Sequence, residues 1–152
     1  MRVHIVAVGR LKASPHEGLA RHYAERITWP LTIREIEEKR SLPRSALKER
    51  EGALLLSATP ANAVVVALDE RGKMLASETF AHRIAAWRDA GRGDLAFLIG
   101  GADGLSDAVR EKADLVLSLG AMTWPHLLVR GMLLEQIYRA QQILAGHPYH
   151  RA

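Results

Sequence analysis

The sequence predicts an α/β protein in which helices cover a parallel β-sheet. Apolar or β-branched runs alternate along the whole chain with stretches of helical periodicity. Strands that alternate with helices in this way form parallel sheets. Two of the runs, residues 63–68 and 95–99, contain no polar residue, which is typical of strands buried on both faces.

Five segments have the pattern of strands: residues 3–8, 31–36, 63–68, 95–99 and 115–119. The first is a β-branched run that Gly9 closes. The second alternates apolar and polar residues, as a half-exposed strand does. The third and fourth are the continuous apolar runs, and Gly100-Gly101 stops the fourth. The fifth precedes the last long helix.

Five segments have helical features: about residues 15–27, 43–57, 77–90, 106–113 and 125–146. Residues suited to helix starts precede three of them: Ser41 with Pro43, Ser106, and Thr123 as the N-cap of the last. Gly91 ends the third helix, and Gly146 ends the last. No repeat or long linker breaks the pattern, so we expect a single domain over residues 1–152.

The composition of the 152 residues is that of a soluble globular protein, with 48% hydrophobic and 25% charged residues. The absence of cysteine excludes disulfides, a thiolate nucleophile and a Cys-ligated zinc site. The first residues do not form a signal peptide, and no apolar run approaches the roughly 20 residues of a membrane span. We expect a cytoplasmic protein with no membrane partner.

The charge is distributed unevenly and suggests a polyanionic partner. The net charge is +4; residues 1–60 hold 11 Lys/Arg and 7 Asp/Glu, and residues 61–152 hold 10 of each. A basic excess favours nucleic-acid binding. Six cations are candidates for an RNA-facing surface: Arg34, Lys39, Arg40, Arg44, Lys48 and Arg50. The alternative is a solvated helix face balanced by four carboxylates: Glu37, Glu38, Glu49 and Glu51.

Three loops after expected strands are candidates for a ligand site: residues 68–72, 99–104 and 119–124. Ligands of open α/β sheets bind beyond the carboxyl ends of strands. If the loops are adjacent, they form one pocket of backbone amides, carbonyls and apolar side chains. The glycines of residues 100–104 match neither a dinucleotide fingerprint nor a P-loop. They indicate either a tight turn or close backbone approach to a ligand.

The loops suit an adenosine with an uncharged or zwitterionic tail better than a nucleoside triphosphate. No Lys or Ser/Thr follows the glycines to meet phosphates and Mg²⁺. Leu68, Leu119 and Met122 provide aliphatic contacts for an adenine. A metal site is not expected at His126, His147 and His150, because no cysteine or carboxylate pair accompanies them. No GxSxG motif indicates a serine nucleophile.

The last helix and the tail after it combine apolar surface with polar and titratable groups. The apolar face of residues 125–146 is broad enough to pack on the sheet and on a second subunit. Glu135, Gln136 and Arg139 could then pair across an interface. Tyr149-His150-Arg151 is interpreted as a recognition or proton-handling cluster, or as an interface.

Over its full length the chain resembles the bacterial ribosomal RNA large subunit methyltransferase H family, minimal members of the SPOUT methyltransferases. The resemblance is densest in five motifs: Leu68-Asp69-x-x-Gly72-Lys73, Phe97-Leu98-Ile99-Gly100-Gly101-x-x-Gly104-Leu105, Met122-Thr123-x-Pro125-His126, Glu135-Gln136-x-Tyr138-Arg139-Ala140 and Tyr149-His150. Each motif is weak alone, but their order is specific.

The resemblance implies a C-terminal deep trefoil knot, a homodimer, and S-adenosylmethionine as the cofactor. It implies methylation of N3 of a pseudouridine in helix 69 of 23S rRNA, on the assembled ribosome. The implied cofactor contacts are Leu68, Gly100, Leu119, Gly120, Ala121, Met122, Thr123 and Trp124. This chain departs from the family at Gly120, where Ser is frequent, and at Trp124, where Leu or Phe is usual.

The methyl acceptor must lose its N3 proton, which requires a base or a positioned water. We expect the catalytic residues to be His150, Tyr149 and Arg139. His150 is the first candidate for base or substrate positioner, with Tyr149 stacking on the base or holding the ribose. Arg130 and Arg139 could meet RNA phosphate or stabilise the imide anion; the alternative is an inter-subunit salt bridge with Glu135.

Two other functions are compatible with the same fold. One is a catalytically silent RNA- or ribosome-binding module, against which the apolar loop at residues 119–124 argues. The other is a related methyltransferase that acts on tRNA. The absence of an appended RNA-binding domain speaks mildly against the latter.

Overall fold

The computed structural model describes residues 1–150, without the side chain of His150; Arg151 of the predicted tail cluster lies outside the described residues. The strands are β1 (Arg2–Val8), β2 (Leu31–Ile36), β3 (Val64–Met74), β4 (Asp94–Ile99) and β5 (Leu115–Ser118). The helices are α1 (Glu17–Ala24), α2 (Arg44–Ser57), α3 (Ser77–Asp89), α4 (Asp107–Lys112), α5 (His126–Leu144) and the short 3₁₀ helix η1 (Pro148–His150).

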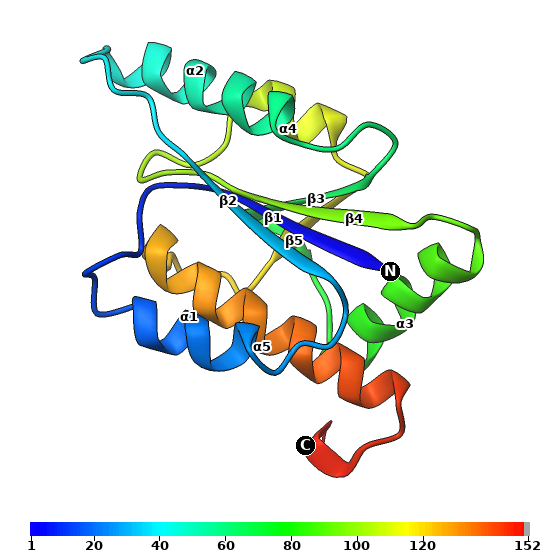
Figure 1. Ribbon diagram of the computed structural model, residues 1–152. Helices are drawn as coiled ribbons and strands as arrows, with labels where there is room; N and C mark the ends of the chain where they lie inside the picture. The colour runs from blue at the N-terminus through cyan, green and yellow to red at the C-terminus, as the bar shows by residue number, and fades with distance from the viewer. Residues whose placement is uncertain (151–152) are drawn as a thin grey trace.

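The five strands form one parallel sheet in the order β2-β1-β4-β3-β5. Helices α2 and α4 cover one face, while α1, α3 and α5 cover the other (Figure 1). The predicted α/β class is therefore confirmed, whereas the threading of a trefoil knot stays a prediction. Because the strands are parallel, the loops that follow them all emerge at the same edge of the sheet. No helix within residues 1–150 is long and apolar enough to cross a membrane.

Alternate side chains of the central strands supply two hydrophobic layers. Val64 and Val66 of β3 face the layer beneath α1, α3 and α5, whereas Val65 and Ala67 face α2 and α4. All four are buried, as are the residues of β4 from Leu95 to Ile99. This two-sided burial explains the uninterrupted apolar runs, because each side chain of these strands loses its contact with water.

Strand β3 is longer than the apolar run that predicts it. It continues past Leu68 to Met74, and Leu117 of β5 pairs first with Leu68 and then with Lys73. The chain therefore bulges over residues 69–72 before it returns to β5. At Gly72 a Cβ would lie 2.5 Å from the carbonyl oxygen of Val116, so only glycine permits this return. The apolar pattern predicts a strand that ends at Leu68, because the residues of the extension are mostly charged and exposed.

The helix starts are confirmed in one case and wrong in another. The Ser106 hydroxyl accepts a hydrogen bond from the backbone N–H of Val109 at 3.4 Å and caps α4 as predicted. Thr123 does not cap α5, whose N-cap is Pro125 with no side-chain hydrogen bond. Instead the Thr123 hydroxyl donates to the carboxylate of Glu70 at 2.6 Å, which ties the loop before α5 to the β3 extension.

A buried arginine joins the start of α5 to the opposite end of the sequence. The side chain of Arg130 is only 2% exposed. It donates to the Glu35 carboxylate at 2.5 Å and to the carbonyl of Gly9 at 3.2 Å. Glu35 also accepts from the backbone N–H of Leu11 at 2.8 Å. Burial raises the pKa of Glu35, but the hydrogen bonds from Arg130 and Leu11 outweigh it and leave that pKa lowered.

We expect Arg130→Ala to lower the free energy of unfolding by about 2–4 kcal/mol, because it leaves Glu35 without its partner. The difference from the native protein should shrink as the pH falls from 7 through the lowered pKa of Glu35, since a protonated carboxyl no longer needs the cation. Urea unfolding at several pH values measures this. Arg21→Ala, which breaks an exposed pair with Glu17, is the control and should cost less than about 1 kcal/mol. Equal losses in the two variants would contradict the structural role of Arg130.

Candidate functional site

The three loops predicted to form a pocket meet at the carboxyl edge of the sheet. They enclose a cavity of about 830 Å³. Of the residues implied as cofactor contacts, those lining it are Leu68, Gly100, Leu119, Gly120, Met122, Thr123 and Trp124, whereas Ala121 does not. The size falls in the upper part of the roughly 300–1,000 Å³ range of small-molecule sites.

The glycine loop forms one wall of the cavity through its backbone. Gly101 and Gly104 form an isolated bridge, and a hydrogen bond of 3.0 Å joins the Gly104 N–H to the Gly101 carbonyl. A Cβ on Gly100 would lie 2.7 Å from the carbonyl oxygen of Gly104, so a side chain there would force the loop apart. The tight turn is therefore confirmed, and the loop lines the cavity, whereas close approach to a ligand stays a prediction.

The loop between β5 and α5 forms the opposite wall. The Ser118 hydroxyl donates to the Gly120 carbonyl at 2.8 Å and accepts from its N–H at 3.1 Å. Gly120 has a φ of 130°, a conformation that a side chain disfavours, which accounts for glycine at this position. Met122 and Trp124 are 74% and 41% exposed, so two large apolar side chains stand at the mouth of the cavity.

Charged groups at the cavity are mostly paired with one another. Asp69 binds Arg71 at 3.1 Å and Arg110 at 3.3 Å. Burial raises the pKa of Asp69, but these arginines, Arg71 above all, leave it lowered, so the carboxylate stays ionised. Glu70 is held by Thr123. The cavity thus presents backbone and apolar walls with a charged rim.

His126 lines the cavity, although sequence reasoning named it only in a family motif and as a possible metal ligand. Its pKa is lowered by burial first, and then by the positive charges of Arg130 and His16. The imidazole is therefore neutral at pH 7. Its place directly after a loop that follows a strand was the signal available in the sequence. Among the side chains that the structure describes, which leave out His150, no group of three or more His, Cys, Asp or Glu is arranged to hold a metal ion.

The predicted catalytic residues gather elsewhere, at the far end of α5. Arg139 binds the carboxylate of Glu135 at 2.6 Å and lies over the ring of Tyr149, 4.8 Å from its centroid. The Tyr149 hydroxyl donates to Glu135 at 3.1 Å. Burial and then this carboxylate raise the pKa of Tyr149 to about 12, so the phenol stays protonated. The side chain of His150 lies outside the described residues.

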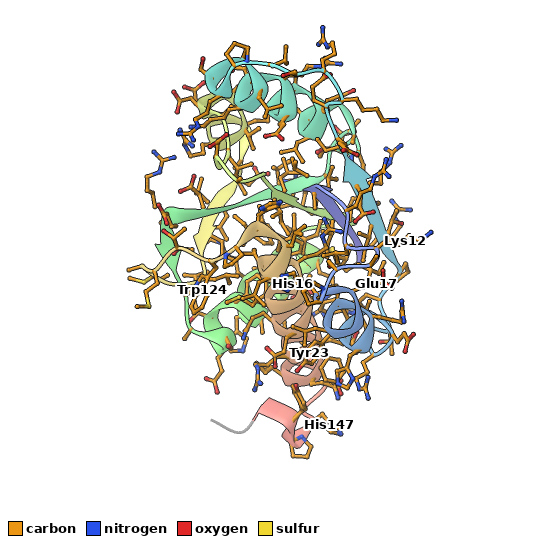
Figure 2. The ribbon with its side chains drawn as sticks, turned by 90° about the vertical axis from the view of Figure 1, so that its left-hand side faces the viewer. Lys12, His16, Glu17, Tyr23, Trp124 and His147 are labelled. Carbon is orange, nitrogen blue, oxygen red and sulfur yellow. The ribbon has the colours of Figure 1, made fainter. Side chains whose placement is uncertain are left out.

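This tail cluster is remote from the cavity of the same chain. Arg139 follows His126 by 13 residues on one straight helix, which amounts to roughly 20 Å at 1.5 Å per residue. Figure 1 shows α5 running from the carboxyl edge of the sheet to η1, and Figure 2 shows Trp124 and His147 well apart. The structure therefore does not bring the predicted catalytic and cofactor residues together within one subunit.

The contacts of Arg130 and Arg139 differ from those expected from the sequence. Arg139 does pair with Glu135, but within one chain. For Arg130, contact with RNA phosphate is wrong, because its side chain is buried against Glu35 and Gly9. Sequence reasoning missed this pair because 95 positions separate its members.

A family model described as predicted SPOUT methyltransferase matches residues 1–150. The chain belongs to this family. A ribosomal RNA large subunit methyltransferase H of Rhodospirillum centenum is 59% identical over 152 residues, which cover 100% of both chains. A protein of the same name in Paramagnetospirillum magneticum is 58% identical over 151 residues, which cover 99% of each chain.

Solved structures of other methyltransferases share the fold. A methylase family protein of Haemophilus influenzae superimposes with a TM-score of 0.58 at 12% identity, over 99% of this chain and 70% of that one. A methyltransferase of Legionella pneumophila, solved with bound S-adenosylmethionine, has a TM-score of 0.52 at 13% identity over 92% of this chain and 66% of that one. This SPOUT methyltransferase is accordingly an enzyme that uses S-adenosylmethionine.

The cavity of this SPOUT methyltransferase fits such a cofactor. Its walls are apolar side chains and close-packed backbone, and the cradle at Gly100 is one that a Cβ would fill. The neutral state of His126 leaves no imidazolium beside a ligand that is itself a sulfonium cation.

A second cavity of about 420 Å³ lies beside the first, between α1, α3 and α5. Leu119 lines both cavities. The other residues lining the second cavity include Leu19, Tyr23, Phe80 and Met132, together with Glu135 of the tail cluster. Most of this lining is apolar, and α5 contributes Gly131, Met132, Leu133, Glu135 and Gln136 to it.

Proposed function

We propose that this protein methylates N3 of a pseudouridine in helix 69 of 23S rRNA, within the assembled ribosome, with S-adenosylmethionine as the donor. It would act in the cytoplasm as a homodimer of single-domain subunits. The observation that carries the proposal is the convergence of three strand-end loops on one cavity, in a chain 59% identical over its whole length to a ribosomal RNA large subunit methyltransferase H.

The cofactor residues proposed are those of the two walls. Leu68 and Leu119 would contact the adenine, the backbone of Gly100 would approach the nucleoside, and residues 119–124 would enclose the rest. When bound, S-adenosylmethionine supplies an electrophilic methyl group. The residues of the cavity exclude water and hold the donor in place, and positioning of this kind contributes roughly 7–11 kcal/mol to the lowering of a barrier.

The cavity is large enough to receive a base as well as the cofactor. Enzymes that modify a base take it out of its stack and hold it in a pocket, often against apolar or aromatic side chains. Met122 and Trp124, exposed at the mouth, are suited to that contact. Trp124, a departure from the family pattern, would hold the base with a larger apolar surface than Leu or Phe.

The tail cluster is proposed to reach this cavity from the second subunit. Within one chain, roughly 20 Å of helix α5 separates Arg139 from the cavity. A second copy packed on the apolar face of α5 would supply Arg139, Tyr149 and His150 in trans. Tyr149 remains a neutral phenol that can stack or donate. His150 is the proposed base or positioner for the N3 proton.

Methyl transfer from labelled S-adenosylmethionine tests the function. We expect assembled ribosomes to accept the label, and separate subunits and bulk tRNA to accept at least tenfold less. Mass spectrometry of digested 23S rRNA should place the methyl on a pseudouridine of helix 69. Label confined to tRNA would favour the tRNA enzyme, and no transfer with intact ribosome binding would favour the silent module.

The glycine cradle yields a binding prediction. Gly100→Ala should weaken S-adenosylmethionine binding by more than tenfold, because its Cβ would meet the Gly104 carbonyl. Calorimetric titration measures the affinity. Gly18→Ala in α1, where a Cβ meets nothing within 4 Å, is the matched control and should keep the native affinity. An unchanged affinity in Gly100→Ala would place the cofactor elsewhere.

Complementation tests the shared active site. Gly100→Ala and the double variant Arg139→Ala/Tyr149→Phe should each be inactive alone. Co-expressed with different tags, they should form heterodimers that contain one intact composite site, with about a quarter of native activity in a random mixture. Purified heterodimers that stay inactive, although native heterodimers prepared in the same way are active, would show that each subunit works alone.

A further inference from the structure

One stripe of helix α2 faces the glycine loop of the cavity. Arg44, Lys48 and Glu51 recur at spacings of four and three residues, which places them on the same side of the helix. The Arg44 guanidinium lies 3.2 Å from the Asp103 carboxylate, and Lys48 lines the cavity. The Glu51 carboxylate would be 3.1 Å from a Cβ on Gly101. Each member of the stripe thus touches the loop or the cavity itself.

Close packing fixes this stripe in position. At Gly52 a Cβ would lie 2.2 Å from the Ser106 hydroxyl oxygen, so α2 approaches the start of α4 with no room for a side chain. In Figure 1 the N-terminal end of α2 and the connector before it lie at the same edge of the sheet as the glycine loop. The cations at this end of α2 are therefore held beside the cavity mouth.

The structure divides the six cations predicted for an RNA surface into two groups. Arg40 and Arg50 both bind Glu38, at 3.0 and 2.9 Å, and mainly through Arg40 they lower the pKa of that carboxyl to about 2. Arg34 donates to the carbonyl of Ala58, at the other end of α2. These three are engaged within the protein or lie away from the cavity.

The remaining three cations are Lys39, Arg44 and Lys48. Within the described residues, neither lysine has an ion-pair partner within 4 Å, and the side chain of Arg44 is 85% exposed despite its contact with Asp103. Glu49 points to another side of α2, five residues after Arg44. Glu51 is buried, and burial and then Asp103 raise its pKa, so it adds little negative charge to the exposed surface.

We propose that Lys39, Arg44 and Lys48 form a phosphate-binding ridge, which holds the RNA backbone next to the cavity while the target base is inside it. The ridge rests on the proposed function for the identity of the RNA. Its chemistry is that of non-specific backbone contact: Arg44 and Lys48 lie on a packed helix and Lys39 in the connector before it, beside a pocket whose walls are apolar. Arg44 would exchange Asp103 for a phosphate or bridge the two.

Salt dependence of ribosome binding tests the ridge. Each lost phosphate contact lowers the slope of log Kd against log salt concentration by about 0.7–0.9. We expect the triple variant Lys39→Gln/Arg44→Gln/Lys48→Gln to lose about 2–3 of that slope and to bind at least tenfold more weakly at low salt. The control, Arg83→Gln/Arg88→Gln/Arg92→Gln on and after α3, removes the same charge and should keep the native slope.

Two further variants make the result specific. Arg44→Lys/Lys48→Arg retains the charges and should retain the slope, whereas Lys39→Gln alone, in an exposed connector, should lose about 0.7–0.9. Cofactor affinity, measured by calorimetry, should change less than threefold in Lys39→Gln, whose side chain does not line the cavity. An unchanged slope in the triple variant overturns the ridge, whether or not cofactor binding is lost.

Methylation by the native protein, measured on the same ribosomes, separates the two proposals. If the native protein methylates the ribosomes and the triple variant keeps the native salt slope, the ridge is rejected and the proposed reaction stands. A reduced slope with no native methylation supports the ridge and rejects the proposed reaction.

Discussion

The contact between Arg130 and Glu35 is the constraint on which the functional half of the molecule depends. A buried guanidinium requires a partner, and breaking such a pair costs more than forming it gains. Here the pair joins helix α5 to β2, and the Gly9 carbonyl joins both to the end of β1. The Nε of Arg130 has no hydrogen-bond partner among the described residues. The pair holds the first turns of α5 against the ends of β1 and β2, next to the loop at residues 119–124 that precedes the helix.

The cavity follows from this placement and from parallel strands, with few dedicated side chains. Its walls are loop backbone shaped by Gly100 and Gly120. The nearby carboxylate of Asp69 forms ion pairs with Arg71 and Arg110. The predicted catalytic residues Arg139 and Tyr149 stand instead at the far end of α5, whereas His126 lines the cavity itself. Within one chain the cavity and the tail cluster thus lie towards opposite ends of α5, and the proposed second subunit would bring them together.

Much of the fold and of the cavity could be predicted from sequence, because their signals are local. Apolar runs located β3 and β4, Gly9 and Gly100 located strand ends, and parallel topology then placed three loops at one edge. The remainder depends on distant partners. Glu35 and Arg130 are 95 positions apart in the sequence. The Thr123 hydroxyl donates to Glu70 and does not cap α5. The extension of β3 pairs with β5. The alternative that carboxylates balance the basic residues is confirmed at Glu38, which binds Arg40 and Arg50.

The position of α5 in the chain also bears on how the protein is made. Leu133, Leu134, Ile137 and Ala140 cover one face of the sheet, yet they follow all five strands in the sequence. Until they emerge, the apolar side chains of β1, β4 and β3 on that face remain open to solvent, and Glu35 has no cation. The hydrophobic layer between α1, α3 and α5 thus closes only after α5 has been synthesised, through contacts of large separation in the sequence.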